Sequence, residues 1–133
     1  MRDVGAARRF WVEVMGFEPI NEQPTYCLVF NRGAGLAIIL TDHGDTVSVA
    51  FDKHHAGLDH LSYAVPDGES LRRWEQRLAD FQVPHSPIVE ADAGHHLDLR
   101  APDNVPIELY VMTPEFAREL GLDAGREPVA ATG

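Results

Sequence analysis

The stretch Gly57-Leu58-Asp59-His60-Leu61-Ser62-Tyr63-Ala64-Val65 decides how the rest of the chain is interpreted. Its apolar residues alternate with polar or small ones, which is typical of a strand that lays one face on a core. The apolar face is formed by Leu61, Tyr63 and Val65. The opposite face carries His60, Ser62 and Ala64. The pattern therefore predicts a strand from which His60 points away from the core.

A second stretch, Val105-Pro106-Ile107-Glu108-Leu109-Tyr110-Val111, alternates in the same way. Ile107 and Leu109 fall on its apolar face, so Glu108 points to the other side. A histidine and a carboxylate on the polar faces of two strands can bind one divalent metal ion. We therefore expect His60 and Glu108 to meet at such an ion.

Composition places the chain among ordinary soluble domains and restricts its partners. The 133 residues are most simply one domain, with a hydrophobic content of 44%. The formal net charge is -10, from 21 acidic against 11 basic residues. Nucleic acids and anionic membranes would repel this charge, so neither is expected as a partner.

The single cysteine, Cys27, excludes an internal disulfide and lies in an apolar run, where a small core residue is the simplest interpretation. No apolar run approaches the roughly 20 residues that span a bilayer, and the N-terminus carries no apolar stretch typical of a signal peptide. We therefore expect a cytoplasmic protein.

The remaining chain predicts alternating helices and strands. Helices are expected over 3–15 and 69–80 and again over 114–120, with Asp3, Asp67 and Thr113 in capping positions. Strands are expected over 26–30, 36–40, 83–90 and 94–100, and residues 17–20 lead into the first of them. The segment 44–57 is a long connection that could include a short strand over 47–51. The segment 123–133 is rich in Ala, Gly and Pro and is expected to be a loose tail.

The first two helices are repeats of one another. Asp3 to Phe17 aligns without gaps on Asp67 to Phe81, at an offset of 64 (67 − 3). The chain therefore reads as two β-α-β-β-β units, over 1–52 and 57–112, with most of the first strand of the first unit missing. At this offset, the equivalent of His60 falls upstream of Met1.

These features resemble the vicinal oxygen chelate superfamily, which includes glyoxalase I, extradiol dioxygenases and the fosfomycin- and bleomycin-resistance proteins. The resemblance rests on the two units, on the histidine stretch quoted first, and on Ala101-Pro102-Asp103-Asn104-Val105-Pro106-Ile107-Glu108-Leu109-Tyr110. It implies an α+β fold whose two modules form a curved mixed sheet around a cavity.

The resemblance also places His60 and Glu108 on two metal-ligand positions of the second unit. A third ligand normally comes from the first strand of the first unit, and the position of a further carboxylate falls on Ile39, which cannot bind metal. Three explanations stay open: the true start lies upstream, another residue substitutes, or the site is degenerate.

Other polar residues are candidates for contacts with a substrate. If Leu97 and Leu99 face the core, then His96, Asp98 and Arg100 share a cavity with Glu108. His96 and Asp98 are predicted as acid/base groups, and the alternative is that they are simply polar residues on an open sheet face. The predicted substrate-binding residues are His43, Ser62, Arg100 and Tyr110.

The leading hypothesis from the sequence is a metal-dependent enzyme of the glyoxalase or dioxygenase type, and the sequence leaves open whether the protein is an enzyme. A divalent ion (Fe, Mn, Zn or Ni) would act as Lewis acid on a small molecule with neighbouring oxygens. The alternative is a metal-free protein that binds a drug, as bleomycin-resistance proteins do. A homodimer is expected because a truncated first strand leaves a sheet edge that needs a partner.

Overall fold

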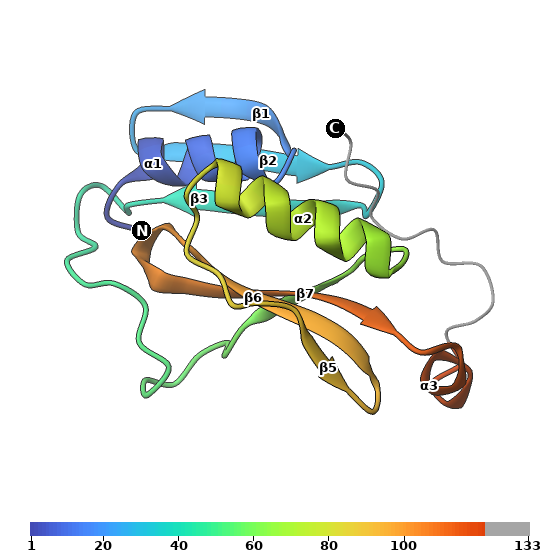
Figure 1. The fold of residues 1–133 in the computed structure, drawn as a ribbon. Helices are drawn as coiled ribbons and strands as arrows, with labels where there is room; N and C mark the ends of the chain where they lie inside the picture. The colour runs from blue at the N-terminus through green and yellow to red at the C-terminus, as the bar shows by residue number, and fades with distance from the viewer. Residues whose placement is uncertain (122–133) are drawn as a thin grey trace.

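The part of the chain that the computed structural model describes folds into two sheets and three α-helices (Figure 1). The structure describes residues 1–121. The first sheet is antiparallel, in the order β1 (Glu18–Gln23), β2 (Tyr26–Asn31) and β3 (Leu36–Thr41). The second sheet has the order β4 (Leu61–Ala64), β7 (Val105–Met112), β6 (Gly94–Ala101) and β5 (Val89–Ala91). Only the β4–β7 pair among these strands is parallel, so the predicted α+β fold is confirmed.

Each half contains a helix whose first turn is capped by an aspartate. The Asp3 carboxylate accepts a hydrogen bond from the Ala6 N–H at 2.8 Å, and the Asp67 carboxylate accepts one from the Ser70 N–H at 2.7 Å. The first cap opens α1 (Val4–Arg9), which continues as a π-helical turn over Phe10–Val14. The second cap opens α2 (Gly68–Asp80). The two aspartates that align at an offset of 64 in the sequence therefore have the same capping role in the structure.

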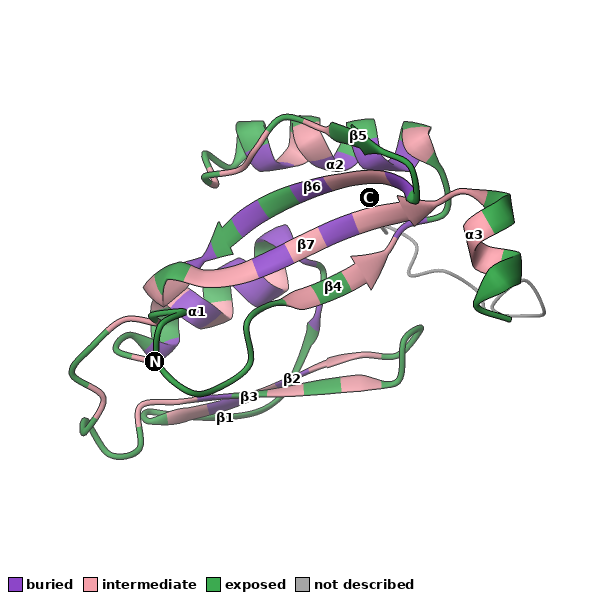
Figure 2. Cartoon of the chain, turned by 90° about the horizontal axis from the view of Figure 1, so that it is seen from below, coloured by how far each residue is buried: buried purple, intermediate pink, exposed green. Residues whose placement is uncertain are grey.

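In each half the helix packs on strands of its own sheet: α1 on β2 and β3, and α2 on β6 and β7. The buried residues of both halves form one continuous hydrophobic core. The fully buried leucines of this core are Leu40, Leu71, Leu78, Leu97, Leu99 and Leu109. Figure 2 looks onto the face of the second sheet that carries no helix. This open face is where the polar side chains of β6 and β7 lie.

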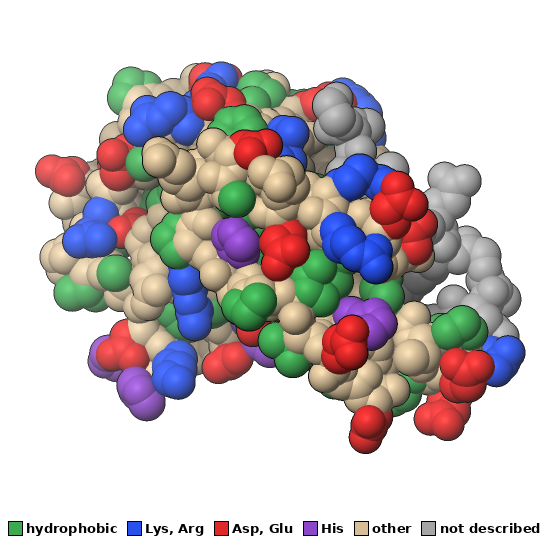
Figure 3. Space-filling model, in the orientation of Figure 1, with side chains coloured by type: hydrophobic (Ala, Val, Ile, Leu, Met, Phe, Trp, Pro, Cys, Tyr) green, Lys and Arg blue, Asp and Glu red, His purple; other side chains and the backbone are tan. Residues whose placement is uncertain are grey.

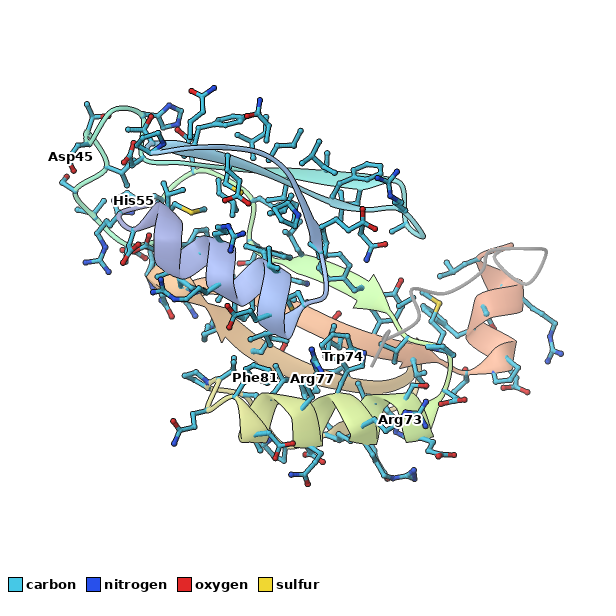
Figure 4. All side chains as sticks on the ribbon, turned by 90° about the horizontal axis from the view of Figure 1, so that it is seen from above. Asp45, His55, Arg73, Trp74, Arg77 and Phe81 are labelled. Atoms are coloured by element: carbon cyan, nitrogen blue, oxygen red, sulfur yellow. The ribbon has the colours of Figure 1, made fainter. Side chains whose placement is uncertain are left out.

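Arg77 links the helix of the second half to that of the first. Its Nε donates to the Val14 carbonyl oxygen and its Nη2 to that of Glu13, each at 2.8 Å. The guanidinium carbon also lies 5.1 Å from the centre of the Phe81 ring. Figure 4 shows Arg77, Trp74 and Phe81 on the side of α2 that faces the rest of the molecule.

Several strand boundaries differ from those expected. β4 begins at Leu61, so His60 precedes the strand and does not lie within it. The pairing of Leu61 with Ile107 would bring His60 opposite Pro106, which has no N–H to donate. The segment 47–51 is not a strand, although the Phe51 N–H donates to the Asp103 carbonyl at 2.8 Å.

Two further segments differ. Only the end of 83–90 is a strand, because Pro84 and Pro87 interrupt the run and β5 begins at Val89. β1 is a full strand where the sequence indicated only a lead-in. Its residues are all exposed, so pairing with β2 rather than burial holds it in place. The final helix, α3 (Pro114–Glu119), is capped by Thr113 as expected, and the predicted tail lies outside the described residues.

Candidate functional site

The open face of the second sheet carries two rows of side chains from adjacent strands. Ser62 pairs with Glu108, which pairs with Asp98 on the other side, so residues of β4, β7 and β6 form one row. Ala64, Tyr110 and His96 form the next row in the same order. The intervening residues Leu97, Leu99 and Leu109 are buried on the opposite face. Strand register alone therefore brings these separated residues together.

Glu108 lies beside a hollow of about 340 Å³ that Ser62, His96 and Tyr110 also line. The Ser62 hydroxyl donates to Glu108 Oε1 at 2.9 Å, which fixes the carboxylate against β4. This volume is at the lower end of the range for small-molecule pockets. The pairing across the sheet thus supplies a carboxylate, an imidazole, a phenol and a hydroxyl around one concavity.

The sequence did not indicate which residues complete the lining of this hollow. Phe116 of α3, Met112 and Gly94 contribute to its lining. Gly94 has φ of 142°, and a Cβ there would collide with the carbonyl oxygen of Val111. Gly94 at the start of a polar strand was the one sequence feature that pointed to a close backbone approach here. The position of α3 depends on the tertiary structure.

His60 lies at a second hollow, of about 500 Å³, under the loop between β3 and β4. Its Nδ1 is 2.6 Å from Asp59 Oδ2, and this hydrogen bond is the main cause that raises the pKa of His60. The negative charges of Glu108 and Asp98 raise the pKa of His60 further. His60 is therefore within electrostatic reach of Glu108, although the two side chains line different hollows.

Three predicted residues lie away from the Glu108 hollow. His43 is in the turn after β3, with φ of 54°, and does not line either hollow. Arg100 shares the open face by register but lines a different depression, beside Pro102 and Asn104. Asp98 is directly across from Glu108 and exposed, outside the lining of its hollow.

The first half presents apolar residues where the second half presents polar ones. Equivalent hydrogen bonds show which residues of the two halves correspond. The Met1 nitrogen donates to the Thr41 carbonyl oxygen at 2.7 Å, and the Val65 N–H, 64 residues later, donates to the Tyr110 carbonyl oxygen at 2.8 Å. Thr41 thus corresponds to Tyr110 and, two residues earlier, Ile39 corresponds to Glu108. By the pairings of β2 with β3 and of β6 with β7, the equivalents of His96 and Asp98 are Tyr26 and Leu28.

The donors for a metal ion form an incomplete set. His60 and Glu108 are two donors, and Ile39 stands at the equivalent carboxylate position with 57% of its surface exposed. Among residues 1–121, no group of three or more His, Cys, Asp or Glu side chains is arranged to hold a metal. The described residues therefore do not by themselves fit the three-ligand centre that the resemblance implies.

The surface over the helices carries charges of both signs. Figure 3 shows acidic and basic side chains interspersed over the face that carries the helices, without a continuous basic patch on it. Within the part of the chain that the structure describes, every helix is too short or too polar to span a bilayer.

Comparison with solved structures identifies the fold. No family model matches the sequence, and no curated protein shows significant sequence similarity to it. A glyoxylase/bleomycin resistance protein/dioxygenase domain from Frankia sp. EAN1pec superposes with a TM-score of 0.74 at 28% identity, covering 90% of this chain and 91% of that one.

Two more distant structures have the same fold. Lactoylglutathione lyase from Agrobacterium tumefaciens gives a TM-score of 0.65 at 15% identity, covering 83% of this chain and 86% of its own. TnmS3, an antibiotic binding protein from Streptomyces sp. CB03234, gives 0.63 at 22% identity, covering 84% and 88%. The curved pair of sheets and the likeness to the Frankia domain show that the chain has the fold of the vicinal oxygen chelate superfamily, which the sequence resemblance implied.

Proposed function

We propose that this protein binds a small molecule bearing a positive charge or hydrogen-bond donors in the hollow beside Glu108. The observation that carries the proposal is the Ser62–Glu108 hydrogen bond beside a hollow of about 340 Å³ that His96 and Tyr110 also line. A carboxylate held this way accepts from a cationic or donor group. The net charge of -10 favours the approach of a cation. The likeness to an antibiotic binding protein is consistent with this reading.

The neighbouring groups would determine what happens to the bound molecule. The Tyr110 phenol can donate or accept, and it orients a ligand across the hollow. The His96 imidazole can accept or donate a proton and can therefore exchange one with the ligand. Asp98, across from Glu108, adds negative charge at the rim. The same hollow could thus sequester a ligand or support proton transfer.

A second candidate is a metal-dependent enzyme acting on a molecule with neighbouring oxygens. The observation that favours it is the Asp59–His60 pair, because a carboxylate on Nδ1 leaves Nε2 free, as in many metal-binding histidines. His60 and Glu108 would be two of the ligands, and a third donor would have to come from outside residues 1–121. An ion held there would act as a Lewis acid.

The test is thermal unfolding with n-butylammonium and a panel of amine-bearing antibiotics, with EDTA present throughout. A ligand that binds only the folded state raises Tm. We expect a rise that Glu108→Gln abolishes and that Glu90→Gln, an exposed acidic residue on β5, retains. An equal rise in both variants would contradict binding at Glu108.

The metal-dependent candidate has its own test. Calorimetric titration with Mn²⁺, Zn²⁺ and Ni²⁺ should show one site that His60→Ala and Glu108→Ala each remove. Absence of saturable binding of all these ions to the wild-type protein would remove this candidate and leave the metal-free proposal unchanged.

A further inference from the structure

The second hollow, beneath the loop between β3 and β4, differs in character from the one beside Glu108. Its volume is about 500 Å³, and most of its lining residues are apolar. Two of them expose large side chains, Val49 at 72% and Leu58 at 65%. Exposed apolar residues gathered around one concavity indicate a binding surface more than chance exposure does.

The two hollows are lined in part by neighbouring residues of the same two strands, β4 and β7. Pro106 lines the apolar hollow and Glu108 the polar one, and they are two residues apart on β7. His60, which precedes β4, lines the apolar hollow, and Ser62, two residues later within β4, lines the polar one. Residues two apart on a strand project from one face about 7 Å from each other. One extended molecule can therefore reach both hollows.

We propose that the apolar hollow is a subsite for the hydrophobic part of the ligand whose polar group binds beside Glu108. The ligand class is thus an elongated amphiphile, with a cationic or donor head and an apolar tail of several carbons. His60, held by Asp59, lies between the two parts and contacts the middle of the molecule. This inference rests on the proposed function, since the head group is placed by Glu108.

A backbone hydrogen bond ties the loop above the subsite to the turn between β6 and β7. The Phe51 N–H donates to the Asp103 carbonyl at 2.8 Å, and Asp103 itself forms an ion pair with Arg2 at 2.6 Å. Phe51 lines the subsite. The tether holds the apolar side of the loop over the start of β7, so the subsite is formed before a ligand arrives.

The experiment uses ¹⁵N-labelled full-length protein titrated with n-butyl-, n-hexyl- and n-octylammonium chloride in EDTA. All three should shift the amide signals of Ser62, Glu108 and Tyr110. Hexyl- and octylammonium should also shift those of residues 57–61. Affinity should rise about two- to fourfold for each added methylene group as the tail enters the apolar hollow.

The variant Leu58→Ser should lose at least half of this dependence on chain length and keep the wild-type affinity for butylammonium. Leu58 is largely exposed, so the change should not unfold the protein, and Val49→Ser provides a second variant. Ile20→Ser, an apolar residue 50% exposed on β1, is the matched control and should retain the full dependence.

The failures of the two proposals are distinguishable. If butylammonium binds at Glu108 but longer chains gain no affinity, or gain it equally in Leu58→Ser, the apolar subsite is wrong and the proposed function stands. If none of the amines shifts the Glu108 signal, the proposed function fails and the subsite fails with it.

Discussion

Ser62 and Glu108 lie directly across from one another on β4 and β7, and the Ser62 hydroxyl donates to the Glu108 carboxylate at 2.9 Å. The bond joins the stretch that opens the second half to the strand that closes it.

The variant Ser62→Ala should weaken ligand binding with little effect on stability. The exposed serine contributes little to unfolding free energy, within about 0.5 kcal/mol, but the released carboxylate would occupy several orientations. We expect affinity for butylammonium to fall about three- to tenfold, which corresponds to the net contribution of one ordinary hydrogen bond. Calorimetry and thermal unfolding measure the two effects, and an unchanged affinity would show that the bond does not position the carboxylate.

His60 should titrate above its ordinary pKa of about 6.5 because the Asp59 carboxylate holds its protonated form. Asp59→Asn should lower the pKa of His60, and Glu108→Gln should lower it by a smaller amount. NMR titration of the imidazole carbon-bound protons measures both. No change in Glu108→Gln would place the two side chains too far apart to share an ion.

The same pair gives stability a pH dependence of definite sign. The pKa of His60 is raised in the folded state. Its contribution to the free energy of unfolding is therefore complete below a pH of about 6.5 and is lost as the pH rises through the raised pKa. Asp59 has a lowered pKa, so its contribution is lost as pH falls through that value. The side chains of His60 and Asp59 are 44% and 74% exposed, so the pH dependence of the unfolding free energy is small and should shrink further in high salt.

Arg77 should contribute to the packing of the two halves. Arg77→Met removes two charged donors from the carbonyl oxygens of Glu13 and Val14, at an expected cost of about 1–3 kcal/mol in unfolding free energy. The matched control is Arg72→Met, an exposed arginine on the same helix, which should change the free energy of unfolding by about 0.5 kcal/mol or less. Urea denaturation should separate the two variants, and equal losses would contradict the linking role.

Gly94→Ala should be strongly destabilising. The backbone there has φ of 142°, and an added Cβ would meet the carbonyl oxygen of Val111 on the paired strand β7. We expect a loss of roughly 3 kcal/mol or more. Gly57→Ala has open space around it and should change stability by less than about 1 kcal/mol. Thermal unfolding followed by circular dichroism compares the two.

A homodimer is our prediction for the protein in solution. β3 pairs with β2 along one edge, and within residues 1–121 its other edge has no strand beside it. Such an edge can pair with another chain. Light scattering should give twice the chain mass of 14.7 kDa at micromolar concentration. Ile39→Glu, on β3, should shift the population toward monomer, and a wild-type monomer would contradict the prediction.

The sequence by itself determined the fold class, the helix caps and which faces of β6 and β7 are polar. Side chains alternate on every strand, and aspartate caps act within a few residues, so these features depend on local chemistry. The gap-free match of Asp3 to Phe17 with Asp67 to Phe81 likewise predicted the repeated helices.

Only the tertiary structure decided which of the predicted polar residues line the same hollow as Glu108. Glu108 meets Ser62 and His96 because β7 lies between β4 and β6, an arrangement that no local pattern encodes. His60 falls outside β4 because its partner position is a proline, and it therefore lines the loop hollow. Strand order and the course of a long loop depend on contacts between residues far apart in the chain, and these fixed the site.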